Sequence, residues 1–279
     1  MKQKPRVLIS TGDPFGIGPE VTGKALREER IKALADFTVI QPSDETGFAA
    51  LRRAVEILKR GEADALVTAP VNKSAINKSG IPFKGHTEYL ATCTRAKKIA
   101  MMFCKDSFRV TIVTRHVALK KVPRLITRAM VRDTIVLTGK ALKKYFNIPS
   151  PKIGVCGLNP HCGEGGLMGT EEKDVIVPAI KSARTRTLRV IGPLPADVIF
   201  YQALRGGFDA VISMYHDQGL APFKMIAFDS GVNVTLGLPF VRTSPDHGTA
   251  YDIAGKGIAD PTSMKQAIKL AVKMCAVRS

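Results

Sequence analysis

Short apolar runs rich in β-branched residues alternate along this chain with longer segments in which apolar residues recur every three to four positions. The short runs predict buried strands and the longer segments predict amphipathic helices. Strands are expected at 6–10, 65–68, 109–114, 152–156, 210–214 and 232–236, and helices at 19–27, 48–59, 131–145 and 263–276. This alternation predicts an α/β fold with a mostly parallel sheet that is covered on both faces.

The size of the chain allows one large domain or two closely associated lobes. It has 279 residues, of which 45% are hydrophobic, enough for a substantial core. No internal repeat, low-complexity tract or linker interrupts the pattern. We therefore expect residues 1–279 to form a single unit, whose two lobes would arise by the chain crossing between them, with a boundary that the sequence does not assign.

Nothing in the sequence predicts export or insertion into a membrane. No apolar run approaches the roughly 18 residues that a transmembrane helix needs. The N-terminal sequence MKQKPRVLISTGDP lacks the apolar core and cleavage site of a signal peptide. The five cysteines are an odd number without a CxxC pair, which argues against a disulfide framework and against a thiolate zinc site. These features predict a cytoplasmic protein without a membrane partner.

The chain is strongly basic, with 42 Lys and Arg residues against 24 Asp and Glu, a net charge of +18. The basic residues are dispersed, and no basic block is interleaved with aromatic residues, so nucleic-acid binding is not expected. The charge either solvates the surface or attracts an anionic substrate.

The five histidines all lie in short polar or Gly-containing stretches that we interpret as turns. His116, His161 and His216 each follow a predicted strand. If those strands are parallel neighbours, the three imidazoles converge at one edge of the sheet. Three neutral imidazoles with an open position suit Zn²⁺, Co²⁺ or Ni²⁺. The alternative, that each histidine caps backbone groups in its own loop, stays open at this point.

Two further features could bind anions. The stretch TGDPFGIGPE (11–20) follows the first strand and opens a helix, whose N-terminus favours an anion. It matches neither the P-loop nor the GxGxxG pattern, so a usual Rossmann site is not supported, and it could simply be a tight turn. Lys224, Asn233 and Arg242 could hold a carboxylate or phosphate, or they could be exposed polar residues of a basic protein.

Taken together, the motifs resemble the 4-hydroxythreonine-4-phosphate dehydrogenase family. The matching segments are TGDPFGIGPE (11–20), DALVTAPVNKSAINKSGIPFKGHTEYLA (64–91), VTRHVALKKVPRLIT (113–127), GLNPHCGEGGLMGTEE (157–172), GPLPAD (192–197) and MYHDQGLAPFKMIAFDSGVNVTLGLPFVRTSPDHGTAYDIAGKGIADPTSM (214–264). They cover nearly the whole chain in the right order, so the probability that the similarity arises by chance is very small.

The resemblance implies a fold like that of isocitrate and isopropylmalate dehydrogenases, with two α/β lobes flanking a cleft. It also implies a homodimer whose active site is shared between chains. The family's metal ligands correspond to His116, His161 and His216, and its substrate-binding positions to His86, Thr87, Lys224, Asn233 and Arg242. The segment 246–261 is similar to the adenosine-binding loop of isopropylmalate dehydrogenases, which implies that His247, Gly248 and Asp252 lie near NAD.

The activity implied by the resemblance is oxidation of 4-phosphooxy-L-threonine by NAD⁺ with a divalent metal, Zn²⁺ or else Co²⁺, Mg²⁺, Mn²⁺ or Ni²⁺. The resulting β-keto acid would decarboxylate to 3-amino-2-oxopropyl phosphate, a step in pyridoxal 5'-phosphate (vitamin B6) biosynthesis. Asp217 is expected to orient His216, and no general base is identified. The sequence does not settle which metal binds, whether NADP⁺ replaces NAD⁺, or whether dimers assemble further.

Two alternatives remain. The motifs do not separate an amino group from a hydroxyl on the second carbon of the substrate, so 4-phospho-D-threonate or 4-phospho-D-erythronate would fit the same residues. A nucleic-acid-binding or scaffold protein without activity is the other alternative, disfavoured because it would need none of these histidines. The chain also departs from the family pattern: residues 28–47 replace a region several tens of residues longer, which could alter the cofactor lobe or the rim of the cleft.

Overall fold

The computed structural model describes residues 3–277, and the chain separates into two compact units. Unit 1 consists of Met1–Lys97 and Asp229–Ser279, and unit 2 consists of Lys98–Phe228. The chain therefore leaves unit 1, builds unit 2 from one continuous segment, and returns. Within the described residues, no helix is long and apolar enough to cross a membrane.

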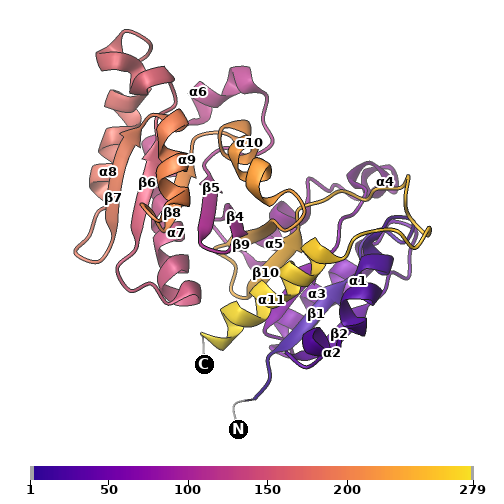
Figure 1. Ribbon diagram of the computed structural model, residues 1–279. Helices are drawn as coiled ribbons and strands as arrows, with labels where there is room; N and C mark the ends of the chain where they lie inside the picture. Colours follow the sequence, from indigo (N-terminus) through magenta and orange to yellow (C-terminus); the bar gives the residue numbers. More distant parts are fainter. Residues whose placement is uncertain (1–2, 278–279) are drawn as a thin grey trace. The chain divides into compact units, whose positions relative to one another are not determined.

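Unit 1 contains five strands in the order β2-β1-β3-β10-β9 (Figure 1). Its elements are β1 (Arg6–Ser10), α1 (Gly18–Arg27), α2 (Glu29–Lys32), β2 (Asp36–Ile40), α3 (Phe48–Lys59), β3 (Ala65–Thr68), α4 (Lys73–Lys78), α5 (His86–Thr94), β9 (Val232–Leu236), β10 (Val241–Pro245) and α11 (Thr262–Ala276). Strands β2, β1, β3 and β10 are parallel, and β9 runs antiparallel to β10. Helix α11 packs against β10, β3 and β9, and α3 packs against β1, β2 and β3.

Unit 2 also contains five strands, in the order β4-β5-β8-β6-β7. Its elements are β4 (Ala100–Lys105), β5 (Phe108–Ile112), η1 (Leu119–Lys121), α6 (Val122–Leu125), α7 (Arg128–Phe146), β6 (Lys152–Cys156), η2 (Pro160–Gly166), η3 (Glu172–Ile176), α8 (Val177–Ala183), β7 (Arg189–Leu194), α9 (Ala196–Leu204), β8 (Ala210–Ser213) and α10 (His216–Ala227). Only β4 and β5 are antiparallel among the pairs of this unit; the others are parallel.

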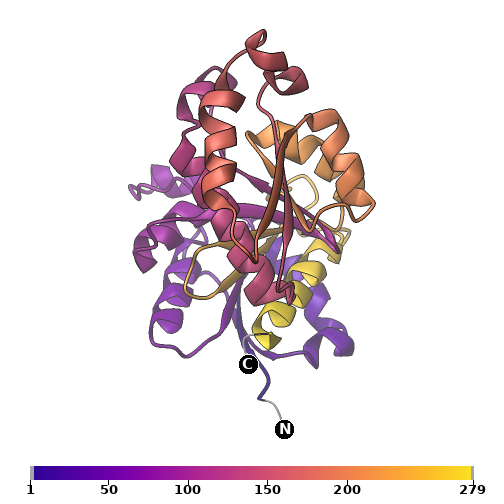
Figure 2. The ribbon, with the colours of Figure 1, turned by 90° about the vertical axis from the view of Figure 1, so that its left-hand side faces the viewer.

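The core of unit 2 lies on both faces of its strands, as the alternation of side chains in a strand requires. On β8, Ile212 packs with α7 and α8, whereas its neighbour Val211 packs with α9 and α10. Figure 2 shows these two pairs of helices on opposite sides of the strands. Every segment predicted as a strand or helix is present, some with the predicted ends and some with shifted ends, and the α/β prediction is confirmed.

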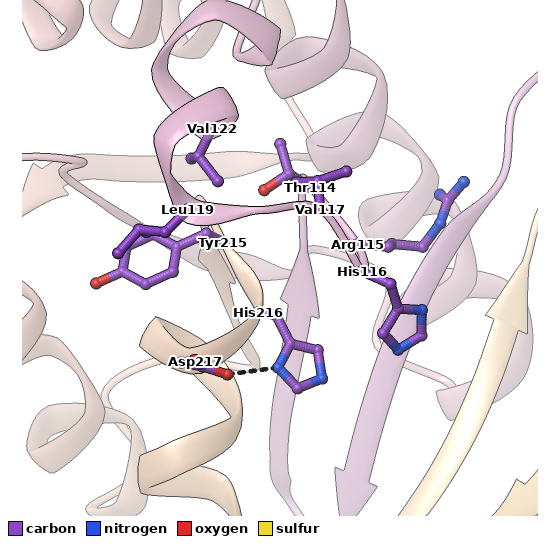
Figure 3. A pocket seen from close by; sticks show the side chains of 9 residues that line it. All are labelled: Thr114, Arg115, His116, Val117, Leu119, Val122, Tyr215, His216 and Asp217. Atoms are coloured by element: carbon purple, nitrogen blue, oxygen red, sulfur yellow. Dashed lines mark hydrogen bonds and ion pairs between the residues drawn. The ribbon is translucent and has the colours of Figure 1, made fainter.

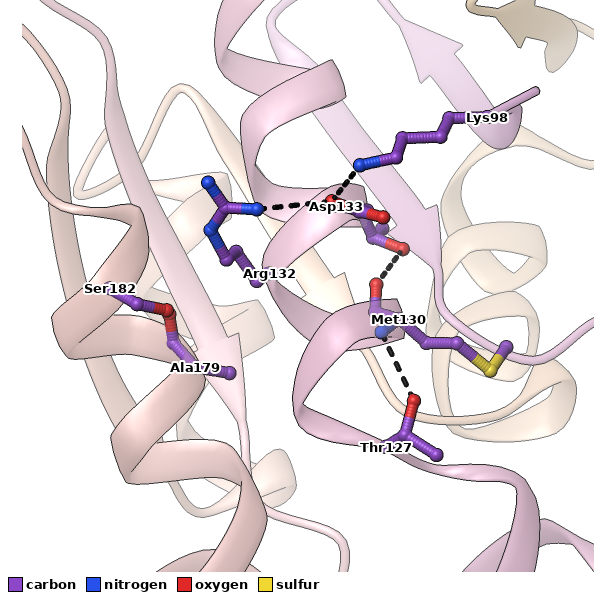
Figure 4. A network of polar contacts seen from close by, with 8 residues as sticks. Lys98, Thr127, Met130, Arg132, Asp133, Ala179 and Ser182 are labelled. Atoms are coloured by element: carbon purple, nitrogen blue, oxygen red, sulfur yellow. Dashed lines mark hydrogen bonds and ion pairs between the residues drawn. The ribbon is translucent and has the colours of Figure 1, made fainter. Parts of the chain in front are cut away.

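Helix α7 shows how local polar contacts fix an element on this core (Figure 4). The Thr127 hydroxyl caps the helix by accepting a hydrogen bond from the Met130 amide at 3.2 Å. On the exposed side of the first turns, Lys98 forms an ion pair with Asp133 at 2.8 Å. The buried side carries Val131, Ile135 and Leu142 into the core.

Two histidines differ from their predicted location. His86 and His216 were interpreted as turn residues, but each is the first residue of a helix, α5 and α10 respectively. The turn interpretation was wrong because polar, Gly-containing stretches also precede helix N-termini. The shortened region 28–47 retains the short helix α2 and strand β2, which pairs with β1 at the edge of unit 1.

Two glycines of α1 provide a matched test of this packing. A Cβ on Gly18 would lie 2.1 Å from the Thr11 carbonyl oxygen, whereas a Cβ on Gly23 would meet nothing within 4 Å. We expect Gly18→Ala to lower the free energy of unfolding by about 1–3 kcal/mol through overpacking. Gly23→Ala should raise it by roughly 0.5–1 kcal/mol, since alanine favours the helix. Urea denaturation of both variants measures the difference, and equal effects at the two positions would contradict the packing assigned to Gly18.

Candidate active site

Three neighbouring parallel strands of unit 2 place histidine-bearing segments at one edge. Strand β8 pairs in parallel with β5 on one side and with β6 on the other. His116 follows β5, His216 follows β8, and His161 follows β6. Because parallel strands end at a common edge, ligand sites in α/β proteins collect there.

His116 and His216 lie together, with ring centroids 5.4 Å apart and ring planes inclined by 43°. They line a pocket of about 190 Å³ with Thr114, Tyr215 and Asp217 (Figure 3). The Asp217 carboxylate oxygen lies 2.7 Å from Nδ1 of His216. A proton on Nδ1 would leave Nε2 of His216 as the nitrogen available to a metal.

His161 is held in an unusual backbone conformation. Residues 161–165 all have positive φ, and His161 itself has φ 49°. His161 is exposed, and among residues 3–277 no group of three or more His, Cys, Asp and Glu side chains is placed to hold a metal ion. The structure thus brings two of the three predicted metal ligands together and leaves the third apart.

The buried carboxylate of Glu172 fixes the segment that leads to His161. It is 5% exposed, and its Oε1 accepts hydrogen bonds of 2.7 Å from the amides of both Leu158 and Asn159. Its Oε2 accepts a third, of 3.0 Å, from the Asn159 side chain. Gln218 of α10 also reaches this segment, because its Nε2 donates to the Gly157 carbonyl at 2.7 Å. The loop after β6 is therefore tied to the helix that carries His216.

A second polar cluster lies in unit 1 around the buried guanidinium of Arg242, on β10. Arg242 is 4% exposed, and it donates to the hydroxyls of Thr235 at 3.0 Å and Thr68 at 2.6 Å. Its Nε is buried without a hydrogen-bond partner among the described residues. Burial lowers the pKa of Arg242 to about 10, with Glu88 acting in the opposite direction. A guanidinium whose close partners are neutral hydroxyls favours the binding of an anion.

Predicted substrate positions surround this guanidinium. His86 begins α5, and its Nε2 is buried without a hydrogen-bond partner in the described chain. Burial, and then the positive charges of Arg242 and Lys73, lower the pKa of His86 well below its ordinary value, so the ring is neutral near pH 7. The Thr87 hydroxyl lies 3.4 Å from that of Thr235, and the Asn233 side-chain oxygen is likewise buried and unpaired within residues 3–277.

The remaining predicted residues lie in other segments. Lys224 belongs to unit 2, on α10, where its Nζ lies 5.6 Å from the centroid of the Phe228 ring. His247, Gly248 and Asp252 lie in the segment between β10 and α11, and Nδ1 of His247 is 2.9 Å from the Gly248 carbonyl oxygen. Gly248 is exposed and has neither a positive φ nor any atom within 4 Å of the position of a Cβ.

Sequence reasoning missed three residues that shape these clusters, namely Glu172, Thr68 and Thr235. For Thr235 a signal existed, because it lies two positions after Asn233 in a predicted strand and so must share its face. Thr68 ends a predicted strand, which also marks the ligand-binding edge. Nothing in the pattern signalled that Glu172 would be buried.

Comparisons with known proteins bear on these clusters. The model of a family described as pyridoxal phosphate biosynthetic protein PdxA matches residues 23–271. A 4-hydroxythreonine-4-phosphate dehydrogenase of Geobacter metallireducens is 42% identical over 329 positions, covering 99% of this chain and 97% of the relative. Since this chain has 279 residues, the alignment contains a stretch that this chain lacks. An Oceanobacillus iheyensis protein, provisionally named D-threonate 4-phosphate dehydrogenase, is 39% identical, and the alignment covers 98% of this chain and 99% of that protein.

Solved structures give the same picture of the fold. The structure of 4-hydroxythreonine-4-phosphate dehydrogenase from Klebsiella pneumoniae matches with a TM-score of 0.84 and 32% identity, covering 98% of this chain and 100% of that one. A β-decarboxylating dehydrogenase from Thermococcus kodakarensis matches with a TM-score of 0.59 and 18% identity, over 96% of this chain and 83% of its own. The second likeness concerns the fold alone, and it confirms the predicted isocitrate-dehydrogenase-like class.

Glu172 can be tested against a neighbour that binds the same side chain. Glu172→Met removes the acceptor of three hydrogen bonds in a buried site, so we expect it to lower the free energy of unfolding by roughly 1–3 kcal/mol. Glu171→Met serves as the control, because Glu171 is less buried and accepts a hydrogen bond from Asn159 at 2.8 Å. Urea denaturation of both variants is the measurement. A loss at Glu171 as large as the loss at Glu172 would contradict the role given to burial.

The lowered pKa of His86 predicts a pH dependence of stability. Unfolded His86 binds a proton below about pH 6.5, whereas folded His86 stays neutral to lower pH. The unfolded chain then holds more protons, so stability falls on acidification between these two pKa values, by at most about 1.4 kcal/mol per pH unit for one group. Denaturation curves from pH 7.5 to 5 should show a shallower decline for His86→Asn than for the wild type. Parallel declines would mean that His86 titrates normally in the folded state.

Proposed function

We propose that this chain, which belongs to the pyridoxal phosphate biosynthetic protein PdxA family, is an NAD-dependent 4-hydroxythreonine-4-phosphate dehydrogenase that uses a divalent metal. Its substrate would be 4-phosphooxy-L-threonine, and its place would be in pyridoxal 5'-phosphate biosynthesis. Relatives that share its full length carry this name, which supports the substrate class.

The observation that carries the proposal is the buried Arg242 guanidinium in unit 1. Its close hydrogen-bond partners are the neutral hydroxyls of Thr235 and Thr68, so no carboxylate of the described residues neutralises its charge through a hydrogen bond. Two more buried polar atoms without partners in the described chain, on His86 and Asn233, lie at positions that the family uses for substrate. An ionised phosphate or carboxylate of the substrate would accept hydrogen bonds from Arg242 Nε and from His86 in the tautomer protonated at Nε2, whereas the Asn233 oxygen would accept one from a donor group of the substrate. We also propose Thr87 and Lys224 as substrate-binding residues.

The proposed reaction moves a hydride and a proton from the substrate's secondary alcohol. The carbon that bears the hydroxyl loses hydride, the hydroxyl loses its proton, and a β-keto acid results. Loss of CO₂, with uptake of a proton at the carbon that it leaves, then gives 3-amino-2-oxopropyl phosphate. NAD⁺ would accept the hydride.

His116 and His216 are the residues that we propose as metal ligands. Two imidazoles with ring centroids 5.4 Å apart fit a shared ion, and His161 would be a third ligand from the loop that Glu172 fixes. A bound divalent ion would act as a Lewis acid that favours ionisation of the substrate hydroxyl. Asp217 would hold the ring of His216 in the orientation and tautomer that binding requires.

The cofactor would be held by the segment between β10 and α11, with His247, Gly248 and Asp252 near the nucleotide. The strongest support is Gly248, since its backbone conformation and surroundings would both accept a side chain. A glycine at such an exposed position leaves room for a ligand to approach the backbone.

We also propose a homodimer with an active site shared between chains. Unit 2 exposes several large apolar side chains, Leu119 at 68%, Leu167 at 86%, Met225 at 88% and Phe228 at 72%. Exposed aromatic, Met and Leu side chains of this kind often mark protein interfaces. No disulfide joins the cysteines of residues 3–277, which fits a reducing compartment, and we place the homodimer in the cytoplasm.

A sister activity is the second candidate. The provisional name of the Oceanobacillus relative, at 39% identity, favours oxidation of 4-phospho-D-threonate. The residues around Arg242 bind the anionic part of either substrate, so they do not distinguish the amino acid from the sugar acid.

The test is formation of NADH by purified protein with NAD⁺, a divalent metal and each of 4-phosphooxy-L-threonine, 4-phospho-D-threonate and 4-phospho-D-erythronate. We expect turnover of the first, lost on chelation with EDTA and in His216→Ala. Arg242→Met should reduce kcat/KM by at least about a hundredfold, because a buried charged hydrogen bond to the substrate anion is worth about 3 kcal/mol.

Arg109→Met is the matched control for the arginine variant. Arg109 is also buried, at 8% exposure, but it lies in unit 2 and donates to the carbonyls of Ser107 and Asp209. Turnover of only a sugar-acid phosphate would move the enzyme to the sister activity. Absence of turnover with every substrate, metal and cofactor would contradict the proposal.

A further inference from the structure

The packing of the stretch TGDPFGIGPE (11–20) requires its glycines. A Cβ on Gly12 would lie 2.2 Å from the Pro70 carbonyl oxygen, and one on Gly16 would lie 2.9 Å from the carbonyl oxygen of Thr249. These distances are shorter than real contacts. The stretch is thus pressed against the backbone of other segments, including the one between β10 and α11.

Part of the start of α1 is already hydrogen-bonded within the protein. The amide of Ile17 donates to the Thr249 carbonyl at 2.9 Å, and the amide of Gly16 donates to the Asp13 carbonyl at 3.1 Å. Pro19 has no amide proton. The stretch therefore contacts the segment between β10 and α11 through a backbone hydrogen bond as well as through the packing of its glycines.

Helix α1 binds the C-terminal part of the 246–261 segment through hydrogen bonds of Glu20 and Lys24. Lys24 Nζ donates to the carbonyls of Gly257 at 2.8 Å and Ala259 at 2.7 Å. Glu20 accepts from the Ala259 amide at 3.0 Å and forms an ion pair with Lys24 at 2.8 Å. Glu20 and Lys24 are four residues apart, so they lie on the same face of α1. This face therefore binds three backbone groups of the segment.

The middle of the segment is held by Asp13. The Asp13 side chain is 2% exposed, and one of its oxygens accepts a hydrogen bond from the Tyr251 hydroxyl. Asn72 donates to the same hydroxyl at 2.9 Å, while its own side-chain oxygen caps α4. The Tyr251 ring remains 46% exposed. Burial and the bond to Asp13 raise the pKa of Tyr251, so it stays protonated and can donate.

We propose that Asp13, Glu20 and Lys24 are positioning residues that hold the 249–259 segment in the conformation that binds the nucleotide cofactor. This inference rests on the proposed function, which assigns the cofactor to that segment. The segment needs such support because its own structure is a succession of turns with positive φ at Ala250, Gly255 and Gly257. A segment already ordered before binding loses less conformational entropy when the ligand arrives, and affinity rises accordingly.

Lys24→Met tests this positioning role, since methionine keeps the apolar stem of lysine and removes the ammonium. We expect the KM and Kd for NAD⁺ to rise about tenfold through lost preorganisation, with kcat within about twofold of the wild type. In the cofactor-free protein, hydrogen exchange of the amides in 253–259 should accelerate by about tenfold, because opening of the segment becomes easier. Tyr251→Phe should act in the same direction, because Asp13 then loses its partner.

Lys265→Met is the matched control. Lys265 lies on α11 in the same unit, is similarly half-buried, and pairs with Glu28 instead of binding the segment. It should leave the Kd for NAD⁺ and exchange in 253–259 unchanged.

Two results would overturn the inference, and they are distinguishable. If calorimetry shows that the wild-type protein, Lys24→Met and Tyr251→Phe bind NAD⁺ equally well, the positioning role is wrong and the proposed function stands. If the wild-type protein binds neither NAD⁺ nor NADP⁺, the proposed function fails, and the positioning role in cofactor binding fails with it.

Discussion

Parallel pairing of strands is the constraint on which the rest of this structure depends. In unit 2, β8 lies between β5 and β6 and runs parallel to both, so the three segments that follow these strands must leave at the same edge. That geometry brings His116 and His216 together although a hundred residues separate them in the chain. The histidines need no local motif, because the sheet supplies their proximity.

Burial of charge shapes both polar clusters. In unit 1, Arg242 lies among hydroxyls with its Nε unpaired within residues 3–277, and the neighbouring His86 is kept neutral. In unit 2, the carboxylate of Glu172 is as deeply buried, but it accepts hydrogen bonds from three donors. A satisfied buried charge fixes a loop, whereas an unsatisfied one favours a ligand of opposite sign. This contrast is why Arg242 carries the functional proposal and Glu172 does not.

Close backbone contact makes three glycines of the N-terminal motif necessary. Gly12, Gly16 and Gly18 let the turn after β1 lie against the backbone of neighbouring segments, where any side chain would collide. Residues 28–47 follow α1 and form a small helix and an edge strand. The described contacts of α1 with the 246–261 segment run through Glu20 and Lys24, which precede that region. Its shortening therefore leaves those contacts in place.

The class of fold, the strands and helices with strong periodicity, and the residue types available for chemistry could all be predicted from the order of the residues. Strands such as 65–68 and 152–156 could be predicted because continuous apolar runs between polar turns have few other structures. Residues 36–40 and 100–105 could not, since a short edge strand and an antiparallel strand carry weaker or ambiguous patterns. For the candidate site, the sequence supplied the three histidines and, through family resemblance, the residues around Arg242.

Which of these side chains meet, and which of their atoms are buried or lack a partner, depends on how the strands and helices pack together. The pairing of His116 with His216, and the separate place of His161, follow from strand order and from a left-handed turn that no residue pattern announces. The hydrogen bonds of the buried Glu172, and those of Lys24 to distant carbonyls, likewise join residues that are separated in the sequence. Such contacts depend on the sum of packing over the whole unit, whereas periodicity reports only on neighbours three or four residues away.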